Sequence, residues 1–192
     1  MRGGRLVFDH LSFALASGDA LLLRGPNGAG KSSLLRVLAG VLEPAAGDLS
    51  WDGRAVRQEV AEHRTRLHLI GHGNALKNAL TARENLHFAV AACGAPAAGV
   101  APALEAFDLG PLAEVPALYL SAGQKRRLAL ARLVAAARPL WLLDEPDTGL
   151  DVASRAQLVQ AVADHRTGGG IVVIATHGEL TVAAPHVLEL AA

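Results

Sequence analysis

Residues 25–32 read G-P-N-G-A-G-K-S and constrain the fold of this chain more than any other stretch. They match the pattern G-x-x-x-x-G-K-[ST], in which glycines let the backbone curl so that successive N–H groups converge on an anion. Residues 20–23 before it are an apolar run typical of a buried strand, and residues 33–39 after it have helical spacing that ends at Gly40. A strand, a glycine loop and a helix in this order predict a nucleotide-phosphate site rather than a chance glycine-rich turn.

Within this loop, Lys31 is expected to reach the β- and γ-phosphates, and the Ser32 hydroxyl is placed to ligate Mg²⁺. The residues predicted to surround the nucleotide are Gly25, Pro26, Asn27, Gly28, Ala29, Gly30, Lys31, Ser32 and Ser33.

Composition limits the remaining classes of protein. A length of 192 residues favours one compact domain with a real core, and 18 basic against 18 acidic residues give no sign of a nucleic-acid partner. The single cysteine, Cys93, excludes a disulfide framework within the chain. No signal peptide is evident, and the longest uncharged stretch, 88–104, is alanine-rich and broken by Gly and Pro. We therefore expect a soluble, cytoplasmic protein, whose membrane spans, if it acts at a membrane, belong to another chain.

Apolar runs predict the order of secondary structure. Strands are expected at residues 6–8, 12–15, 47–53, 67–70, 140–143 and 171–175, and a helix over 152–165 capped by Asp151. Between about residues 72 and 138 the strand signals give way to helical patterns with Pro and Gly breaks. We predict an α/β fold with a mostly parallel sheet covered on both faces, a small antiparallel part near the N-terminus and an α-helical insertion. Residues 1–192 would form one domain, with the core at 1–71 and 139–192 and the helical subdomain at 72–138.

A second motif, L-W-L-L-D-E-P at residues 140–146, is an apolar strand that ends in two acids. Asp144 at the end of the strand is positioned to hold Mg²⁺, through water, and Glu145 to polarise the water that attacks the γ-phosphate. Acids often end strands, so the motif alone is weak. Following a complete phosphate loop, it indicates the second half of a nucleotidase.

A third motif, L-S-A-G-Q at residues 120–124, allows two interpretations. In the first, Ser121 caps a helix and Gln124 reaches back to complete a capping box. In the second, the same helix start offers N–H groups and a positive dipole end to phosphate, so that the signature residues Ser121, Ala122, Gly123 and Gln124 make an accessory phosphate contact. Both interpretations can hold together.

The three motifs in this order, with Thr176-His177 after a final strand, make the chain resemble the ATP-binding cassette (ABC) ATPases over essentially its whole length. The resemblance implies ATP and Mg²⁺ as cofactors and a homodimer in which two copies pair head to tail. Ser121 and Gly123 of one copy would then touch the γ-phosphate held by Lys31 of the other.

The same resemblance assigns the remaining site residues. His177 would contact the γ-phosphate within its own copy and act with Glu145 and Lys31 as the catalytic group. Residues 147–151 (D-T-G-L-D) resemble the loop that crosses the dimer interface, with Asp147 and Asp151 as its acids.

Two positions depart from the family pattern. The family usually has a glutamine after the strand at 67–70, where this chain has Gly71-His72-Gly73-Asn74. Either fewer side chains hold Mg²⁺, or His72 or Asn74 reaches in. The aromatic residue that stacks on adenine is also missing, since residues 2–5 read R-G-G-R, and an arginine plane is the alternative.

Several phrases narrow the resemblance to the ATPase subunit of the haem exporter in bacterial cytochrome c maturation, above all the alanine of L-S-A-G-Q and the tryptophan of P-L-W-L-L-D-E-P. This implies a peripheral homodimer at the cytoplasmic face of the inner membrane, bound to an integral membrane permease on another chain. Another small exporter with different cargo and a soluble non-transport ATPase are the alternatives. No nucleic acid is implied, and neither His72 nor Cys93 indicates a direct haem site.

Overall fold

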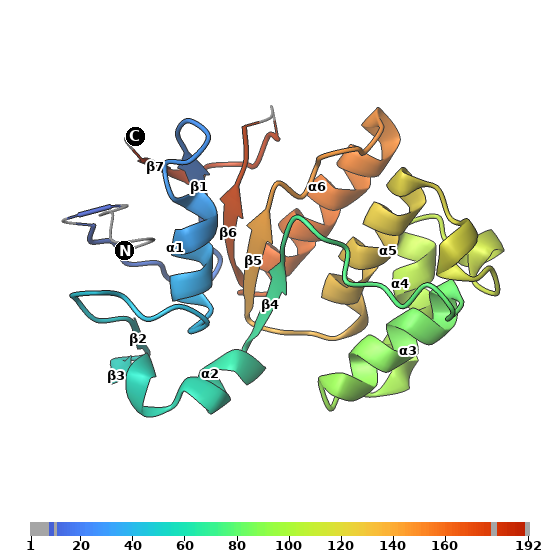
Figure 1. Ribbon diagram of the computed structural model, residues 1–192, viewed down its shortest axis with the longest axis horizontal. Helices are drawn as coiled ribbons and strands as arrows, with labels where there is room; N and C mark the ends of the chain where they lie inside the picture. The colour runs from blue at the N-terminus through green and yellow to red at the C-terminus, as the bar shows by residue number, and fades with distance from the viewer. Residues whose placement is uncertain (1–7, 10, 178–179, 191–192) are drawn as a thin grey trace. The chain divides into compact units, whose positions relative to one another are not determined.

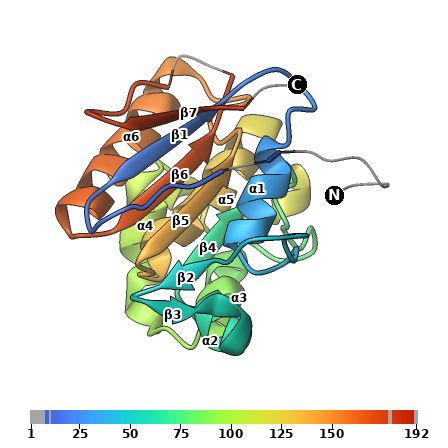
Figure 2. The same cartoon turned by 90° about the vertical axis from the view of Figure 1, so that its left-hand side faces the viewer.

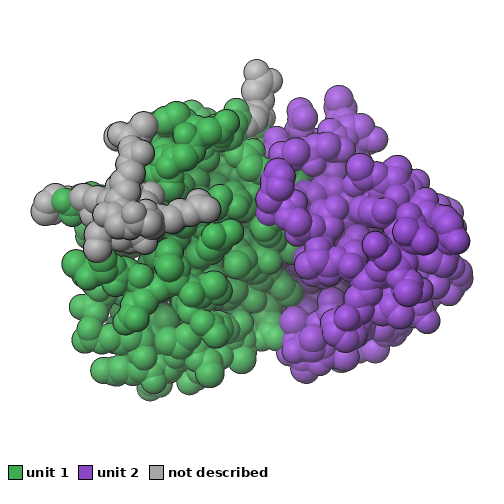
Figure 3. Space-filling view, viewed as in Figure 1, with its two compact units in different colours: residues 1–71, 138–146, 165–192 green, residues 72–137, 147–164 purple. Residues whose placement is uncertain are grey.

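The computed structural model describes residues 8–9, 11–177 and 180–190. Contacts within the chain divide it into two compact units (Figure 3). Unit 1 comprises Met1–Gly71, Arg138–Pro146 and His165–Ala192, and unit 2 comprises His72–Ala137 and Asp147–Asp164. Each unit is described by itself.

Unit 1 is built on a parallel sheet of five strands in the order β4-β5-β6-β1-β7 (Figures 1 and 2). The strands are β1 (Ala20–Arg24), β4 (Leu67–Ile70), β5 (Leu140–Asp144), β6 (Ile171–Ala175) and β7 (His186–Glu189). The α/β prediction with a parallel sheet is confirmed. The edge strand β7 was missed because it is short and largely exposed, so it lacks the apolar run by which the other strands were found.

The helix α1 (Lys31–Leu38) covers one face of this sheet (Figure 2) and contacts β5 and β6. Its buried leucines join those of β1 and β5 in one apolar cluster. The helix ends where the sequence predicted, because the Gly40 N–H donates to the Val37 carbonyl and the Val41 N–H to the Arg36 carbonyl. These two bonds, with φ +63° at Gly40, form the left-handed stop that glycine allows.

A small antiparallel pair, β2 (Ser50–Trp51) and β3 (Arg54–Ala55), follows α1. Asp52 and Gly53 connect the strands with φ of +49° and +76°, the positive pair that a tight two-residue hairpin needs. The Asp-Gly turn was predicted; the returning strand was not. The 3₁₀ turn η1 (Val56–Gln58) and the helix α2 (Val60–Thr65) then lead into β4.

The strand expected at residues 12–15 is wrong, and residues 6 and 7 lie outside the described part of the chain. Residues 11–16 carry no strand assignment. Leu11 and Leu15, with Phe8 before them, lie against the core cluster of unit 1, whereas Phe13 is exposed. The short apolar stretch therefore indicated a strand where the backbone has no partner strand.

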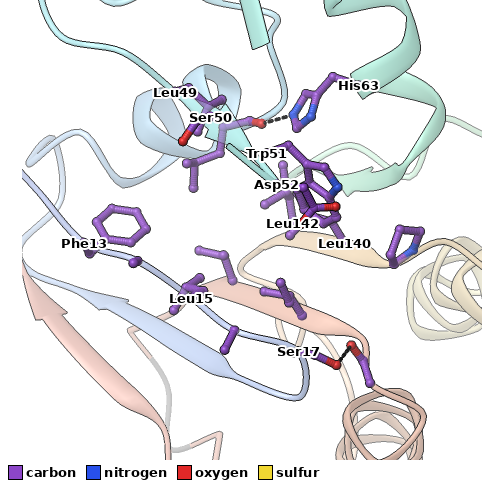
Figure 4. Close-up of a pocket in the computed structure, with 17 residues that line it drawn as sticks. Phe13, Leu15, Ser17, Leu49, Ser50, Trp51, Asp52, His63, Leu140 and Leu142 are labelled. Atoms are coloured by element: carbon purple, nitrogen blue, oxygen red, sulfur yellow. Dashed lines mark hydrogen bonds between the residues drawn. The ribbon is translucent and has the colours of Figure 1, made fainter. Parts of the chain in front are cut away.

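A cavity of about 470 Å³ lies between residues 13–17, the β2–β3 hairpin and the first residues of β5 and β6 (Figure 4). Its walls are mostly apolar. His63 is held at the wall by a hydrogen bond of 2.8 Å between its Nε2 and the Leu38 carbonyl, and the Ser17 hydroxyl donates to the Gly169 carbonyl (Figure 4).

Trp141 on β5 stacks on His165, with ring centroids 3.9 Å apart and an interplanar angle of 6°. Burial lowers the pKa of His165 below its ordinary value, although a hydrogen bond to the Ile171 carbonyl acts in the opposite direction. The ring that marked the subfamily in the sequence is thus part of the packing of unit 1.

Unit 2 consists of helices and short turns. Helical patterns were predicted for residues 72–138, and α3, α4 and α5 lie there, whereas the helix predicted at 152–165 had been assigned to the core. The helices are α3 (Ala82–Ala92), α4 (Val100–Ala106), α5 (Ala122–Ala135) and α6 (Val152–Thr167). The last residues of α6, His165–Thr167, belong to unit 1. Short 3₁₀ turns lie at η2 (Ala97–Gly99), η3 (Gly110–Leu112) and η4 (Ala117–Tyr119). Buried leucines, valines and alanines of α3, α4 and α5 form its core. Within the described residues, no helix combines the length and apolar character that crossing a bilayer requires.

Candidate nucleotide-binding site

The predicted phosphate loop and the acids of the second motif lie at the same edge of the sheet. β1 and β5 are the two neighbours of β6, and both Leu23 and Asp144 are paired with Ala175. Parallel strands lie about 4.8 Å apart, so the backbones of Leu23 and Asp144 are about 10 Å apart at the carboxyl edge. This edge of a parallel sheet is where such folds bind their ligands.

The loop between β1 and α1 has a backbone shape that depends on glycine. Gly25 has φ +134°, and a Cβ built on it would lie 2.3 Å from the Leu190 carbonyl oxygen. Leu190, directly after β7, therefore forms one wall of the loop. The N-cap of α1 is Gly30 with φ +99°, and no side chain caps this helix. Its first N–H groups are therefore not occupied by a capping side chain and suit an anion.

Lys31 is buried, with a relative exposure of 6%, and its ammonium is turned back on its own loop. Nζ donates to the Gly25 carbonyl at 2.7 Å and to the Pro26 carbonyl at 3.1 Å. It also lies 2.8 Å from His177 Nε2. Since an ammonium can only donate, Nε2 of His177 is the acceptor in this contact.

Glu145 follows β5 in a strained conformation, with φ +49° at a residue that is not glycine. Its N–H donates to the Ala175 carbonyl at 2.8 Å, which ties it to the end of β6. Its Oε1 lies 3.4 Å from His177 Nε2, and its Oε2 3.5 Å from the His177 backbone nitrogen. The structure thus brings Lys31, Glu145 and His177 together, although they are far apart in the sequence.

Ser32 and Asp144 fit a magnesium ion by their chemistry. A hydroxyl and a carboxylate are the hard oxygen ligands that Mg²⁺ prefers, and this ion is usually held by one or two protein groups together with phosphates. Within the part of the chain that the structure describes, no cluster of three His, Cys, Asp or Glu forms a separate metal cage.

Unit 2 holds the signature motif and the predicted interface loop together. The Ser121 hydroxyl accepts from the Gln124 N–H at 3.2 Å, and the Gln124 side chain accepts from the Ser121 N–H at 2.8 Å. The capping-box interpretation is therefore confirmed, and the accessory phosphate contact remains a prediction. A Cβ on Gly123 would lie 3.4 Å from the Gly149 carbonyl oxygen, so the start of α5 touches residues 147–151.

The two acids of that loop differ. Asp147 is buried, with a relative exposure of 7%. Asp151 caps α6 as predicted, because Oδ1 accepts from the Ser154 N–H at 2.8 Å. Hydrogen bonds from the Ser154 backbone and hydroxyl lower the pKa of Asp151, and the charge of Arg127 lowers it further.

Of the two positions that depart from the family pattern, the structure describes the segment after β4, and which of its side chains meets Mg²⁺ stays a prediction. Asn74 Oδ1 accepts from buried Arg126 at 3.4 Å, while His72 is exposed. Residues 2–5, where an adenine-stacking group was sought, lie outside the described residues.

Two features escaped the sequence analysis. Thr81 and Glu84 form a second capping box at the start of α3, with the same geometry as that of Ser121 and Gln124. The spacing T-x-x-E before an apolar run was the signal for it. The approach of Leu190 to Gly25 had no local signal, because it joins the ends of two strands distant in the sequence.

The comparison with known proteins decides the family. The sequence profile described as ABC transporter matches residues 8–148. The chain belongs to the ABC transporter family. As an ABC transporter ATP-binding protein it binds ATP, and the predicted resemblance is confirmed.

Its relatives within the family carry one common description. The chain is similar to the cytochrome c biogenesis ATP-binding export protein CcmA of Rhodospirillum rubrum, with 54% identity over 99% of this chain and 82% of that protein. The CcmA of Paramagnetospirillum magneticum is 50% identical over 99% and 89%, and that of Brucella abortus 44% over 92% and 80%. The prediction of a CcmA-type ABC transporter ATPase is confirmed.

Solved structures agree with this fold. An ATP-binding subunit of an ABC transporter superposes with a TM-score of 0.83 at 26% identity, over 91% of this chain and 75% of that one. An ABC transporter ATP-binding protein from Pyrococcus furiosus superposes with a TM-score of 0.85 at 21% identity, over 97% and 92%, which supports the fold alone.

Proposed function

We propose that this chain hydrolyses ATP with Lys31, Glu145 and His177 and drives an exporter that serves cytochrome c biogenesis, with haem as its cargo. The convergence of these three side chains at the carboxyl edge of the sheet carries the catalytic part. The names of relatives up to 54% identical support the role in export. Residues 1–192 would act as one ATPase domain.

In this mechanism the ammonium of Lys31 exchanges the Gly25 and Pro26 carbonyls for the β- and γ-phosphates. The N–H groups of the loop and the uncapped start of α1 hold the same phosphates. Gly25 through Ser33 form this cradle. Ser32 and Asp144 would hold Mg²⁺, which supplies further positive charge to the phosphates.

Glu145 then orients the attacking water and accepts its proton. When Lys31 turns to the phosphates, His177 Nε2 no longer accepts from the ammonium. In the tautomer that carries its proton on Nε2, the ring can then donate from this atom to the γ-phosphate, beside Glu145. The strained backbone at Glu145 holds the carboxylate in this place.

Two copies are expected to complete each other's sites. Ser121, Ala122, Gly123 and Gln124 of one copy would face the γ-phosphate bound by the other, and the loop with Asp147 and Asp151 would lie at the interface. The contact between Gly123 and Gly149 supports this, because one surface of unit 2 then carries both segments. A permease on another chain would hold the dimer at the cytoplasmic face of the inner membrane.

Glu145→Gln tests the catalytic assignment. The variant should bind ATP with unchanged affinity, lose turnover and accumulate as an ATP-bound dimer, because the water is no longer activated. Nucleotide titration, phosphate release and size-exclusion chromatography with ATP measure the three properties. Normal turnover by the variant would remove Glu145 from its proposed role.

The cargo needs a separate experiment. Disruption of the gene, followed by a haem stain for covalently bound c-type cytochromes, should show their loss, and the intact gene on a plasmid should restore them. Normal cytochromes in the disrupted strain would leave the ATPase intact and discard the haem assignment.

A further inference from the structure

Arg127 lies on α5 one turn after the signature glycine, Gly123, and the two residues share a helix face. Gly123 lies next to residues 147–151. Gly123 approaches the Gly149 carbonyl, and the field of Arg127 acts on Asp151 and contributes to its lowered pKa. The first turn of α5 thus lies next to this loop.

The guanidinium of Arg127 also reaches the end of α4. Nη1 donates to the Phe107 carbonyl at 2.9 Å and, less closely, to the Asp108 carbonyl at 3.4 Å. Phe107 is the fully buried C-cap of α4, and the carbonyls at the end of a helix carry the negative end of its dipole. The helices α4 and α5 contact each other (Figure 1), and the Arg127 guanidinium on α5 donates hydrogen bonds to the carbonyls at the end of α4.

The same turn is held from α6. The Gln157 amide donates to the Asp108 carboxylate, and Asp108 itself has φ +49°. Gln157 is on the helix that Asp151 caps. Residues 107–108 are therefore the point at which side chains from α5 and α6 meet.

We propose that Arg127 is a positioning residue that keeps the interface loop 147–151 in register with the signature motif, by fixing α5 to the turn after α4 that Gln157 of α6 also holds. The inference rests on the proposed two-copy site, in which both segments must meet the second copy at once. Arg127 touches neither nucleotide nor water in this scheme. Its loss should therefore act on assembly and turnover, and leave ATP binding by the phosphate loop unchanged.

The test compares Arg127→Met, Arg127→Lys and the matched control Arg83→Met. Arg83 is a half-exposed arginine on α3 of the same unit, and its Nε lies 2.6 Å from Glu114 Oε1. Arg127→Met should lower kcat about tenfold with little change in KM, as a small misplacement of reacting groups does. Arg127→Lys, which keeps the charge and one donor, should recover part of the loss, and Arg83→Met should behave as the unchanged protein.

Two further measurements test whether Arg127 acts through the position of the interface loop: the formation of the ATP-bound dimer and the hydrogen exchange of the loop. In the Glu145→Gln background, Arg127→Met should raise the protein concentration needed for the ATP-bound dimer about tenfold. Hydrogen exchange of the amides at residues 148–154 should become faster in Arg127→Met and stay unchanged in Arg83→Met.

Unchanged exchange, or a loss of kcat no greater than that of Arg83→Met, would overturn the inference. So would an equal loss of ATP affinity, since that would indicate general unfolding. If Glu145→Gln stays monomeric with ATP, the two-copy site fails, and the exchange measurement still decides whether Arg127 orders the loop.

Discussion

The starts of α1 and α5 carry the nucleotide motifs, and they differ in whether a side chain caps the first backbone N–H groups of the helix. α1 begins at Gly30 in the left-handed region, without a capping side chain. α5 begins at Ser121 with a complete capping box. The first start has N–H groups that no side chain caps, whereas the second satisfies two of its own donors.

A third helix start shows what the difference means. α3 begins with a capping box of the same geometry, made by Thr81 and Glu84, and carries no nucleotide motif. A capping box is therefore a local structural device. The phosphate loop can be recognised from its own geometry, while a nucleotide role for α5 depends on where a second copy places its ATP.

The largest expected effect is a loss of ATP turnover on changing Lys31, the first residue of α1. Lys31→Ala should lower kcat/KM for ATP about 10²–10³-fold, because the main cation at the transferred phosphoryl group is lost. Lys77→Ala, which removes an exposed lysine of unit 2 that lies 4.5 Å from the Phe88 ring, is the control and should change little. A steady-state phosphate-release assay measures both.

A mixing experiment extends this prediction. Ser121→Arg should also be inactive, but equal amounts of Lys31→Ala and Ser121→Arg should recover activity, since one site of each mixed dimer is intact. Mixtures that stay as inactive as their components would show that α1 and α5 do not act across two copies.

Three glycines should differ in their contribution to stability. Gly25→Ala combines a positive φ with a contact of 2.3 Å to the Leu190 carbonyl, so it should cost about 3 kcal/mol in the free energy of unfolding. Gly28→Ala has only its φ of +88° and should cost about 1–2 kcal/mol.

Gly123→Ala should change the free energy of unfolding least, because its Cβ would make an ordinary contact of 3.4 Å within a helix. Urea unfolding measures all three variants. Equal losses in the free energy of unfolding would mean that the phosphate loop requires glycine no more strictly than the start of α5 does.

The smallest effect compares the two capping boxes. Ser121→Ala and Thr81→Ala should each lower the free energy of unfolding by about 1 kcal/mol, since each removes one N-cap acceptor. Only Ser121→Ala should also lower turnover. If both variants reduce turnover equally, Ser121 acts as a cap alone, and the signature role assigned to it is lost.

The sequence was informative wherever the signal was local. The turn at Gly40, the cap at Asp151 and the capping box at Ser121 follow from bonds between residues a few positions apart, and all three were predicted. The apolar runs of β5 and β6 predicted buried strands for the same reason. The false strand at residues 12–15 shows the limit, because a short apolar stretch does not tell whether the backbone has a partner strand.

By itself, the sequence determined the family, the parallel α/β core and the order of its motifs, since each depends on residue type and spacing along the chain. Only the tertiary structure decided that Lys31 contacts His177 and that His177 lies beside Glu145. It also decided that Leu190 walls the phosphate loop and that Arg127 meets the end of α4. These contacts join segments brought together by strand order and helix packing, and no local propensity encodes which distant carbonyl or ring a side chain will reach.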